Sequence, residues 1–186
     1  MLRATFSSMA TTSPLLAPGV TMTADEFVAV NFQLWLRQPA SRRNHWILGT
    51  ALMLLAVGVG LDIIRTGHIS SWNTPAFLGV GVLYGLLRTS LVRYQLRRGY
   101  SRNSALREPI SFSFDANMLR GHGATGRFGI SWNKVRRAVW VRPNWLLLYP
   151  DETGCFYVDL RQLQVPATPD GLLTLVRDQQ ISVSEL

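Results

Sequence analysis

Two long apolar runs dominate the hydrophobic pattern of this chain. The first covers residues 46–64 and the second residues 76–92. A helix rises about 1.5 Å per residue, so roughly 18 residues span about 27 Å, close to the hydrocarbon thickness of a bilayer. Two such runs joined by a short loop fit a membrane hairpin better than a pair of buried core helices. The pattern therefore predicts two adjacent transmembrane helices.

An amphipathic helix is predicted over residues 22–38, directly before these runs. Thr23 and Glu26 have the spacing of a capping box, in which each side chain bonds the backbone amide of the other residue. Apolar residues such as Val30 then recur at helical spacing, and Pro39 ends the helix. Because the segment carries few cations, its apolar side can pack on protein or lie in the membrane interface.

Residues 1–21 are rich in Ser, Thr, Ala and Pro, and they contain no apolar run long enough for a signal peptide. We expect a disordered N-terminal tail. The alternative is that the functional start is Met22.

The pattern changes to a period of two after Pro109, which indicates strands with one buried face. Six short strands separated by turns predict a compact antiparallel sheet or a half-open barrel. Thr168 and Pro169 then have the positions of a cap and a first helical residue. The region 109–182 is therefore predicted to be a small antiparallel β domain closed by a C-terminal helix, which makes the fold class an α+β membrane protein.

The distribution of cations predicts the orientation of the hairpin. The net charge is +8, and Lys134 is the only lysine. Eight arginines lie just outside the two runs, whereas only Arg65 lies in the connecting loop. Positively charged residues stay on the cytoplasmic side, so both termini should be cytoplasmic. The flanking arginines are Arg37, Arg42, Arg43, Arg93, Arg97, Arg98, Arg102 and Arg107.

A basic juxtamembrane segment over residues 93–108 is the one surface feature that suggests a ligand. Anionic lipid contributes about 1 kcal/mol per nearby cation. The candidate lipid contacts are Arg93, Arg97, Arg98 and Arg102. The alternative is a topology determinant without a specific ligand. A nucleic-acid partner is not expected, since membrane topology already explains these cations.

Small residues in the second run suggest helix contact within lipid. Gly81 and Gly85 form a GxxxG pattern, which allows two helix backbones to approach closely. Two ionisable residues also fall in the runs. Asp62 and Arg88 would be on the order of 15 Å apart along the hairpin axis, too far to pair, so each is expected to reach its own interface.

No catalytic, metal-binding or cofactor-binding set is expected. His45, His68 and His122 are spread along the chain, and Cys155 falls in a strand-like run. The glycine-rich stretch 121–126 lies between two predicted strands, so a hairpin turn is favoured over a phosphate loop. The remaining candidates for an enzyme are generic acids, namely Asp115, Asp151 and Asp159.

The layout resembles the YcxB-like family of bacterial membrane proteins. The residues that carry the likeness are 23–27 (TADEF) with Asn31, 100–103 (YSRN) with Leu106, 110–114, and 130–132 (ISW) with Val135. The resemblance covers about residues 22–180. It implies a short leading helix, two membrane helices, a β domain of PH-like layout, and a place in the bacterial inner membrane. It implies no catalytic activity and no cofactor.

These patterns suggest a non-enzymatic, multi-pass membrane protein whose cytoplasmic β domain binds a protein partner or the inner-leaflet surface. Membrane lipid is the first expected partner. The alternative is an accessory subunit of a transporter or channel that acts as a homo-oligomer, because two helices cannot enclose a pathway.

Overall fold

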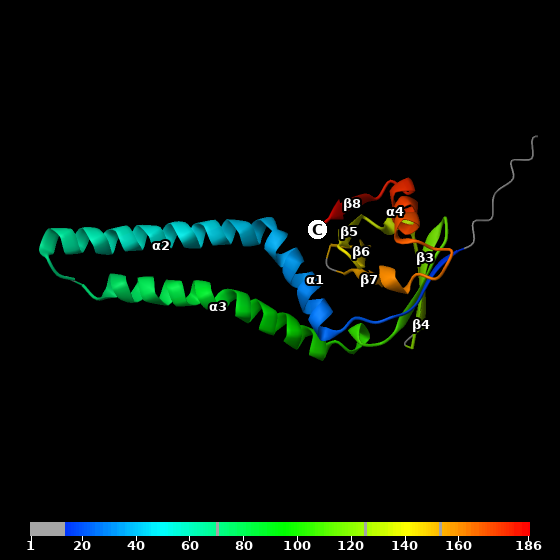
Figure 1. Cartoon of the computed structure of the whole chain (residues 1–186), viewed down its shortest axis with the longest axis horizontal. Helices are drawn as coiled ribbons and strands as arrows, with labels where there is room; N and C mark the ends of the chain where they lie inside the picture. Colours follow the sequence, from blue (N-terminus) through cyan, green and yellow to red (C-terminus); the bar gives the residue numbers. More distant parts are fainter. Residues whose placement is uncertain (1–13, 70, 125, 153) are drawn as a thin grey trace, which may run out of the picture. The chain divides into compact units, whose positions relative to one another are not determined.

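The chain forms two compact units in the computed structural model, which describes residues 14–69, 71–124, 126–152 and 154–186. A helical unit spans Thr23–Ser104. A β unit combines Met1–Met22 with Ala105–Leu186, so the chain leaves this unit and later returns to it. The protein is α+β: two long apolar helices precede two small sheets and a short C-terminal helix (Figure 1).

Three helices build the helical unit: α1 (Ala24–Arg37), α2 (Pro39–Thr66) and α3 (Asn73–Arg102). The predicted capping box is confirmed at the start of α1. The Thr23 hydroxyl accepts from the Glu26 amide at 3.2 Å, and the Glu26 carboxylate accepts from the Thr23 amide at 3.0 Å. This reciprocal pair satisfies two amides that have no partner inside the helix.

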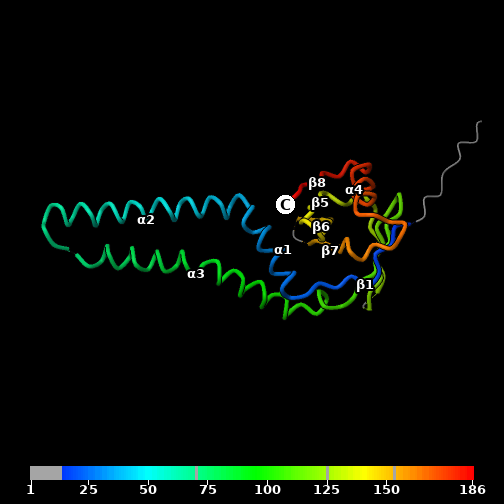
Figure 2. Tube along the Cα trace, viewed as in Figure 1, coloured from blue at the N-terminus to red at the C-terminus, as the bar shows by residue number. Residues whose placement is uncertain are grey.

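Helices α2 and α3 run antiparallel, side by side (Figure 2). A Cβ atom on Gly81 would lie 2.6 Å from Leu52 Cδ2, and one on Gly85 would lie 3.8 Å from Leu48 Cδ2. The two glycines therefore lie on the face of α3 that packs on α2, where small residues permit close approach. From residue 78 onward, the half-buried positions of α3 recur every three or four residues: Leu78, Gly81, Gly85, Arg88, Val92, Leu96 and Tyr100.

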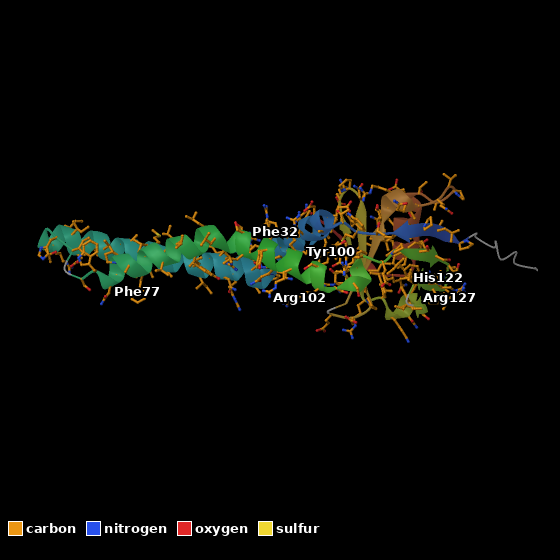
Figure 3. The ribbon with its side chains drawn as sticks, turned by 90° about the horizontal axis from the view of Figure 1, so that it is seen from below. Phe32, Phe77, Tyr100, Arg102, His122 and Arg127 are labelled. Carbon is orange, nitrogen blue, oxygen red and sulfur yellow. The ribbon has the colours of Figure 1, made fainter. Side chains whose placement is uncertain are left out.

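The other faces of α2 and α3 are apolar and exposed. No part of the most apolar 18-residue stretch of either helix is buried. Ile64 of α2 is 80% exposed, and Phe77, which projects from α3 (Figure 3), is 69% exposed. Both helices are long and apolar enough to cross a membrane.

Two four-stranded sheets form the β unit. The first, sheet A, has the order β1-β2-β3-β4 and is antiparallel throughout. Its strands are β1 (Leu15–Val20), β2 (Ile110–Phe114), β3 (Met118–Gly123) and β4 (Gly126–Ser131). The second, sheet B, has the order β7-β6-β5-β8, and β8 is parallel to β5. Its strands are β5 (Arg137–Val141), β6 (Trp145–Tyr149), β7 (Phe156–Asp159) and β8 (Ser182–Glu185).

The core of the β unit is built from alternating residues of sheet A and a continuous run in β6. Phe112 and Phe114 are buried, whereas Ser113 between them is partly exposed, as expected for a strand with one buried face. Every residue of β6 is buried. The helix α4 (Pro169–Asp178) adds Leu172, Leu173 and Val176 to the buried side chains. The predicted cap of α4 is confirmed, with Thr168 accepting from the Gly171 amide and Pro169 in the first turn.

The prediction of a disordered tail over residues 1–21 is wrong for Leu15–Val20, which form the edge strand β1 of sheet A. Ala17 and Val20 are buried. Residues 1–13 of that tail lie outside the described residues. Pro18 and Gly19 weaken the strand signal in the sequence, and the strand is imposed by pairing with β2, about 95 positions later.

Several predicted boundaries also differ from the observed ones. Pro39 does not only end α1; it occupies the first turn of α2, where its missing N–H costs nothing. Helix α3 continues to Arg102, so most of the predicted basic segment 93–108 is helical. The predicted β domain, 109–182, ends at the first residue of β8, and its strands form two sheets rather than one. The predicted antiparallel arrangement is also wrong for β8, which runs parallel to β5.

Candidate functional site

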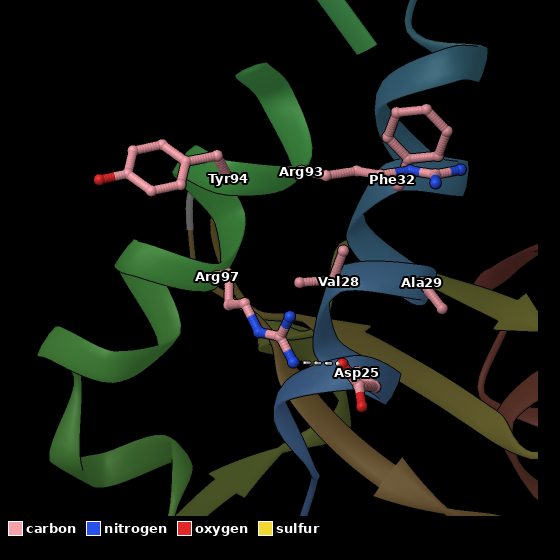
Figure 4. A pocket seen from close by; sticks show the side chains of 7 residues that line it. All are labelled: Asp25, Val28, Ala29, Phe32, Arg93, Tyr94 and Arg97. Carbon is pink, nitrogen blue, oxygen red and sulfur yellow. Dashed lines mark hydrogen bonds and ion pairs between the residues drawn. The ribbon is translucent and has the colours of Figure 1, made fainter. Parts of the chain in front are cut away.

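A basic cleft of about 520 Å³ lies between α1 and the C-terminal third of α3 (Figure 4). In Figure 4 Arg97 reaches toward Asp25 and Arg93 toward Phe32, while Tyr94 points away from α1. The Arg97 Nη2 atom lies 2.9 Å from Asp25 Oδ1, and the Arg93 guanidinium carbon lies 4.6 Å from the Phe32 ring centroid. The cleft is lined by Asp25, Val28, Ala29, Phe32, Arg93, Tyr94 and Arg97.

The structure places the four candidate lipid-contact arginines in two settings. Arg93 and Arg97 line the cleft and contact α1. Arg98 and Arg102 are exposed and do not line it. Because both partners of the Arg97–Asp25 pair are mostly exposed, that pair contributes little stability. Arg93 and Arg97 therefore remain accessible to an anion from solvent despite their contacts with α1.

The three helices of this unit meet at Trp35. The Arg88 guanidinium carbon of α3 lies 5.2 Å from the Trp35 ring centroid, and the ring of His45 on α2 meets Trp35 edge-on at 5.6 Å. His45 Nδ1 lies 2.7 Å from the Ser41 carbonyl oxygen. A carbonyl oxygen only accepts, so Nδ1 donates this bond. Arg88 thus has a protein partner that sequence spacing alone did not identify.

Asp62 lies far from Arg88 along the helix pair. The packing of Leu52 on Gly81 and Leu48 on Gly85 sets the register of α2 against α3, and it puts Arg88 level with His45. Asp62 lines a cavity of about 270 Å³ near the interhelical loop, together with Gly58, Val59, Ile69, Ser71, Thr74 and Pro75. The structure therefore does not bring the two ionisable residues together.

A second basic surface lies on the outward side of sheet A. Strand pairing sets two cross-strand rows there, because residues opposite each other share a face. One row joins Leu16, Ser113 and Arg120, and the other joins Ser111, His122 and Arg127. We call these six residues the sheet A groove. They line a cavity of about 290 Å³ together with Phe112, Gly121 and Phe128.

The cations of the sheet A groove have weak partners. Arg127 Nε donates to His122 Nδ1 at 3.2 Å, and the two side chains lie beside each other in Figure 3. Arg120 Nη2 lies 3.2 Å from Asp115 Oδ2 in a partly exposed pair. Sequence reasoning assigned the glycine-rich stretch to a turn, and β3 and β4 do pair as far as Gly123 and Gly126. It did not identify the groove, because the strand register that brings these residues onto one face was not predicted.

The thiol of Cys155, in the β unit, ionises less readily than that of a free cysteine. Burial raises the pKa of its thiol, and hydrogen bonds with Tyr157 and Tyr149 act in the opposite direction. Burial also raises the pKa of Tyr149 to about 12. A thiol with a raised pKa is a poor nucleophile at neutral pH, which favours a structural role for Cys155.

The three acids considered for catalysis all have structural partners. Asp115 pairs with Arg120, and the Asp151 carboxylate accepts from the Gly154 amide. Asp159 is 2% exposed and accepts from the Arg161 amide at 2.9 Å and from its guanidinium at 2.8 Å.

The described residues contain no group of three or more His, Cys, Asp or Glu side chains arranged to hold a metal ion. His45 and His68 belong to the helical unit, whereas His122 and Cys155 belong to the β unit.

The comparisons with known proteins assign no family to the chain: no model of a protein family, no curated protein and no solved structure matches it.

Proposed function

We propose that this chain is a non-enzymatic binding module, anchored in the membrane by α2 and α3, whose β unit captures an acidic segment of a protein partner. The observation that carries the anchor is the exposed apolar surface of both helices. Exposed apolar surface costs about 25 cal/mol per Å² in water. A lipid environment removes that cost, because acyl chains solvate such faces.

The orientation follows from the cations and aromatic residues at the two ends of the hairpin. Eight arginines flank the apolar runs on the side of the termini, which favours a cytoplasmic location for both. Trp46 is 72% exposed and Trp72 is 74% exposed, and they lie at opposite ends of the helix pair. Exposed tryptophans suit the two membrane interfaces. Together with the YcxB-like resemblance, this supports a bacterial inner-membrane protein.

The sheet A groove supports the binding role of the β unit. Its floor is mostly apolar, and it is bordered by the residues Arg120, Arg127 and His122. Guanidinium groups form strong charge-assisted hydrogen bonds with carboxylates and phosphates. The groove therefore suits an acidic peptide, and the inner-leaflet surface is the competing ligand.

The anchor is tested by fractionating cells that express the full chain. We expect the protein in the membrane pellet after a carbonate wash. A phosphatase fused at the C-terminus should be inactive, because that enzyme requires export. Recovery of the chain in the supernatant would refute the anchor, and an active fusion would refute the cytoplasmic location of the C-terminus.

The binding role is tested with the full chain in nanodiscs of neutral lipid. The Arg120→Gln, Arg127→Gln double variant should lose capture of acidic peptides relative to the unchanged chain. The matched control is Arg177→Gln, which removes an exposed arginine of α4 outside the groove. Equal binding by the double variant and the control would refute the role, and retention on anionic vesicles alone would assign the groove to lipid.

The oligomeric accessory subunit has less support. Its motivation was the Gly81–Gly85 pattern together with Arg88. The glycine face of α3 packs on α2 of the same chain, and Arg88 contacts Trp35 of α1. An oligomer would therefore need another face of the hairpin.

A further inference from the structure

A groove of about 470 Å³ runs along the N-terminal part of α2, on a face that α3 does not cover. We call it the α2 groove. Its α2 residues recur at helical spacing: Arg42, His45, Trp46, Gly49, Thr50 and Met53. Leu36 of α1 supplies the neighbouring wall.

The chemistry of the α2 groove changes in one direction along the helix. Arg42 lies before the apolar run and carries a positive charge, while His45 offers a ring nitrogen. Trp46 is the first residue of the apolar run, and Met53 lies well inside it. The order is cation, hydrogen-bonding group, aromatic ring and apolar floor. A phospholipid presents the complementary order from phosphate to glycerol to acyl chain.

The dimensions of the groove also fit one leaflet. Met53 lies eleven positions after Arg42, which corresponds to about 16 Å at helical rise. One leaflet, with its headgroup region included, is about 20–22 Å thick, so the groove fits within a single leaflet. Gly49 opens the middle of the groove, because a Cβ atom placed there would meet no heavy atom within 4 Å. A chain of methylene groups can therefore lie against the backbone at this point.

We propose that the α2 groove binds one anionic phospholipid of the inner leaflet, with its phosphate beside Arg42 and one acyl chain over Gly49. The charge of Arg42 selects an anionic headgroup over a zwitterionic one. The position of Trp46 matches the interfacial level where glycerol lies. This inference rests on the proposed membrane anchor and adds a defined ligand to it.

Two pairs of variants test the proposal in the full chain purified in detergent. Gly49→Leu fills the groove, and Gly79→Leu is its control, since Gly79 is also a helical glycine with open space around its Cβ position. Arg42→Gln removes the charge, and the neighbouring Arg43→Gln is its control, because Arg43 does not line the groove. Leucine favours helix over glycine, so these changes retain α2 and α3.

Lipid binding is measured by native mass spectrometry with dioleoyl phosphatidylglycerol and dioleoyl phosphatidylcholine. We expect one tightly retained phosphatidylglycerol per chain. Arg42→Gln should weaken phosphatidylglycerol binding about fivefold and phosphatidylcholine binding less, because the choline charge already offsets the phosphate. Gly49→Leu should weaken both lipids, and both controls should bind as the unchanged chain does. Inorganic phosphate should not compete, because the acyl chain contributes to binding.

Equal behaviour of Gly49→Leu and Gly79→Leu, or of Arg42→Gln and Arg43→Gln, would overturn the proposal. A dimer that Gly49→Leu dissociates would assign the groove to a second copy of the chain instead. Either result, with the protein still in the membrane pellet, leaves the anchor intact. Recovery of the unchanged chain in the supernatant would remove both.

Discussion

At the residue scale, Phe128 links the two sheets of the β unit. Its ring stacks on Phe156 of β7 with centroids 4.8 Å apart and meets Phe112 of β2 at 6.4 Å. It also lies directly over Gly121, where a Cβ atom would approach Phe128 Cζ to 2.0 Å. The absence of a side chain at residue 121 therefore permits an aromatic ring to cross β3.

Gly121→Ala should displace this ring and destabilise the β unit by about 1–3 kcal/mol, the usual cost of overpacking a core. The measurement is denaturant unfolding of the full chain in detergent, followed by tryptophan fluorescence. Gly129→Ala is the control, since a Cβ atom there would meet Met118 Cε at an ordinary 3.5 Å. Equal loss of stability in both variants would contradict the role assigned to Phe128.

Tyr149 should make the β unit sensitive to alkali. Its pKa is raised to about 12, chiefly by burial, whereas an unfolded tyrosine ionises near 10. The folded state therefore retains the proton over a range where the unfolded state releases it. The resulting stability is fully present below about pH 10 and is lost as the pH rises toward 12. The loss is on the order of 2 kcal/mol.

Tyr149→Phe should flatten this decline when unfolding free energies are compared between pH 9 and pH 12. Parallel curves for the two proteins would show that Tyr149 does not titrate in this way.

At the element scale, α1 packs antiparallel along the end of α3. Phe27 meets Tyr100 with ring centroids 5.6 Å apart, and the last of the paired contacts joins Trp35 to Arg88. Sequence reasoning left open whether α1 packs on protein or on lipid. The contacts with α3 show that its apolar side packs on protein.

Trp35→Ala should loosen α1, because it removes the ring that contacts both α2 and α3. A cation–π contact of this kind is worth roughly 1 kcal/mol. Amide hydrogen exchange in α1 should therefore quicken by about five- to tenfold, as measured by mass spectrometry. Gln33→Ala, at an exposed position of the same helix, is the control. Unchanged exchange in the Trp35 variant would contradict the junction.

The edge strand β1 should be required for a stable β unit. A chain that lacks residues 1–20 loses the partner of β2 and the buried side chains of Ala17 and Val20. We expect residues 105–186 alone to unfold at a lower denaturant concentration than the same residues joined by a flexible linker to residues 14–22. Burial contributes about 1.5–3 kcal/mol for a valine side chain and about 0.8 kcal/mol for an alanine methyl group. Identical midpoints would mean that β1 is dispensable.

At the scale of the whole molecule, local sequence patterns predicted most helices and strands. The sheet A groove and the Arg88–Trp35 contact are formed by residues that lie far apart in the chain. The apolar runs, the Thr23 cap and the alternation around Phe112 depend on neighbouring residues, so the sequence alone predicted two long helices and six strands. The strands β1 and β8 depend on pairing with β2 and β5, far away in the chain. The sheet A groove and the contact of Arg88 with Trp35 depend on such pairings too, so sequence spacing could not reveal them.

The discontinuous β unit has a consequence for how the chain is threaded. Ala17 lies opposite Phe112, although the whole helical unit separates them in sequence. If the helices enter a bilayer, an odd number of crossings would leave these two strands on opposite sides of about 30 Å of hydrocarbon. Strands β1 and β2 can therefore pair only if the chain crosses the bilayer an even number of times. This requirement is independent of the distribution of arginines. A chain with one helix left outside the membrane would therefore lack the β1–β2 pairing and would leave the β2 edge of sheet A without its partner strand.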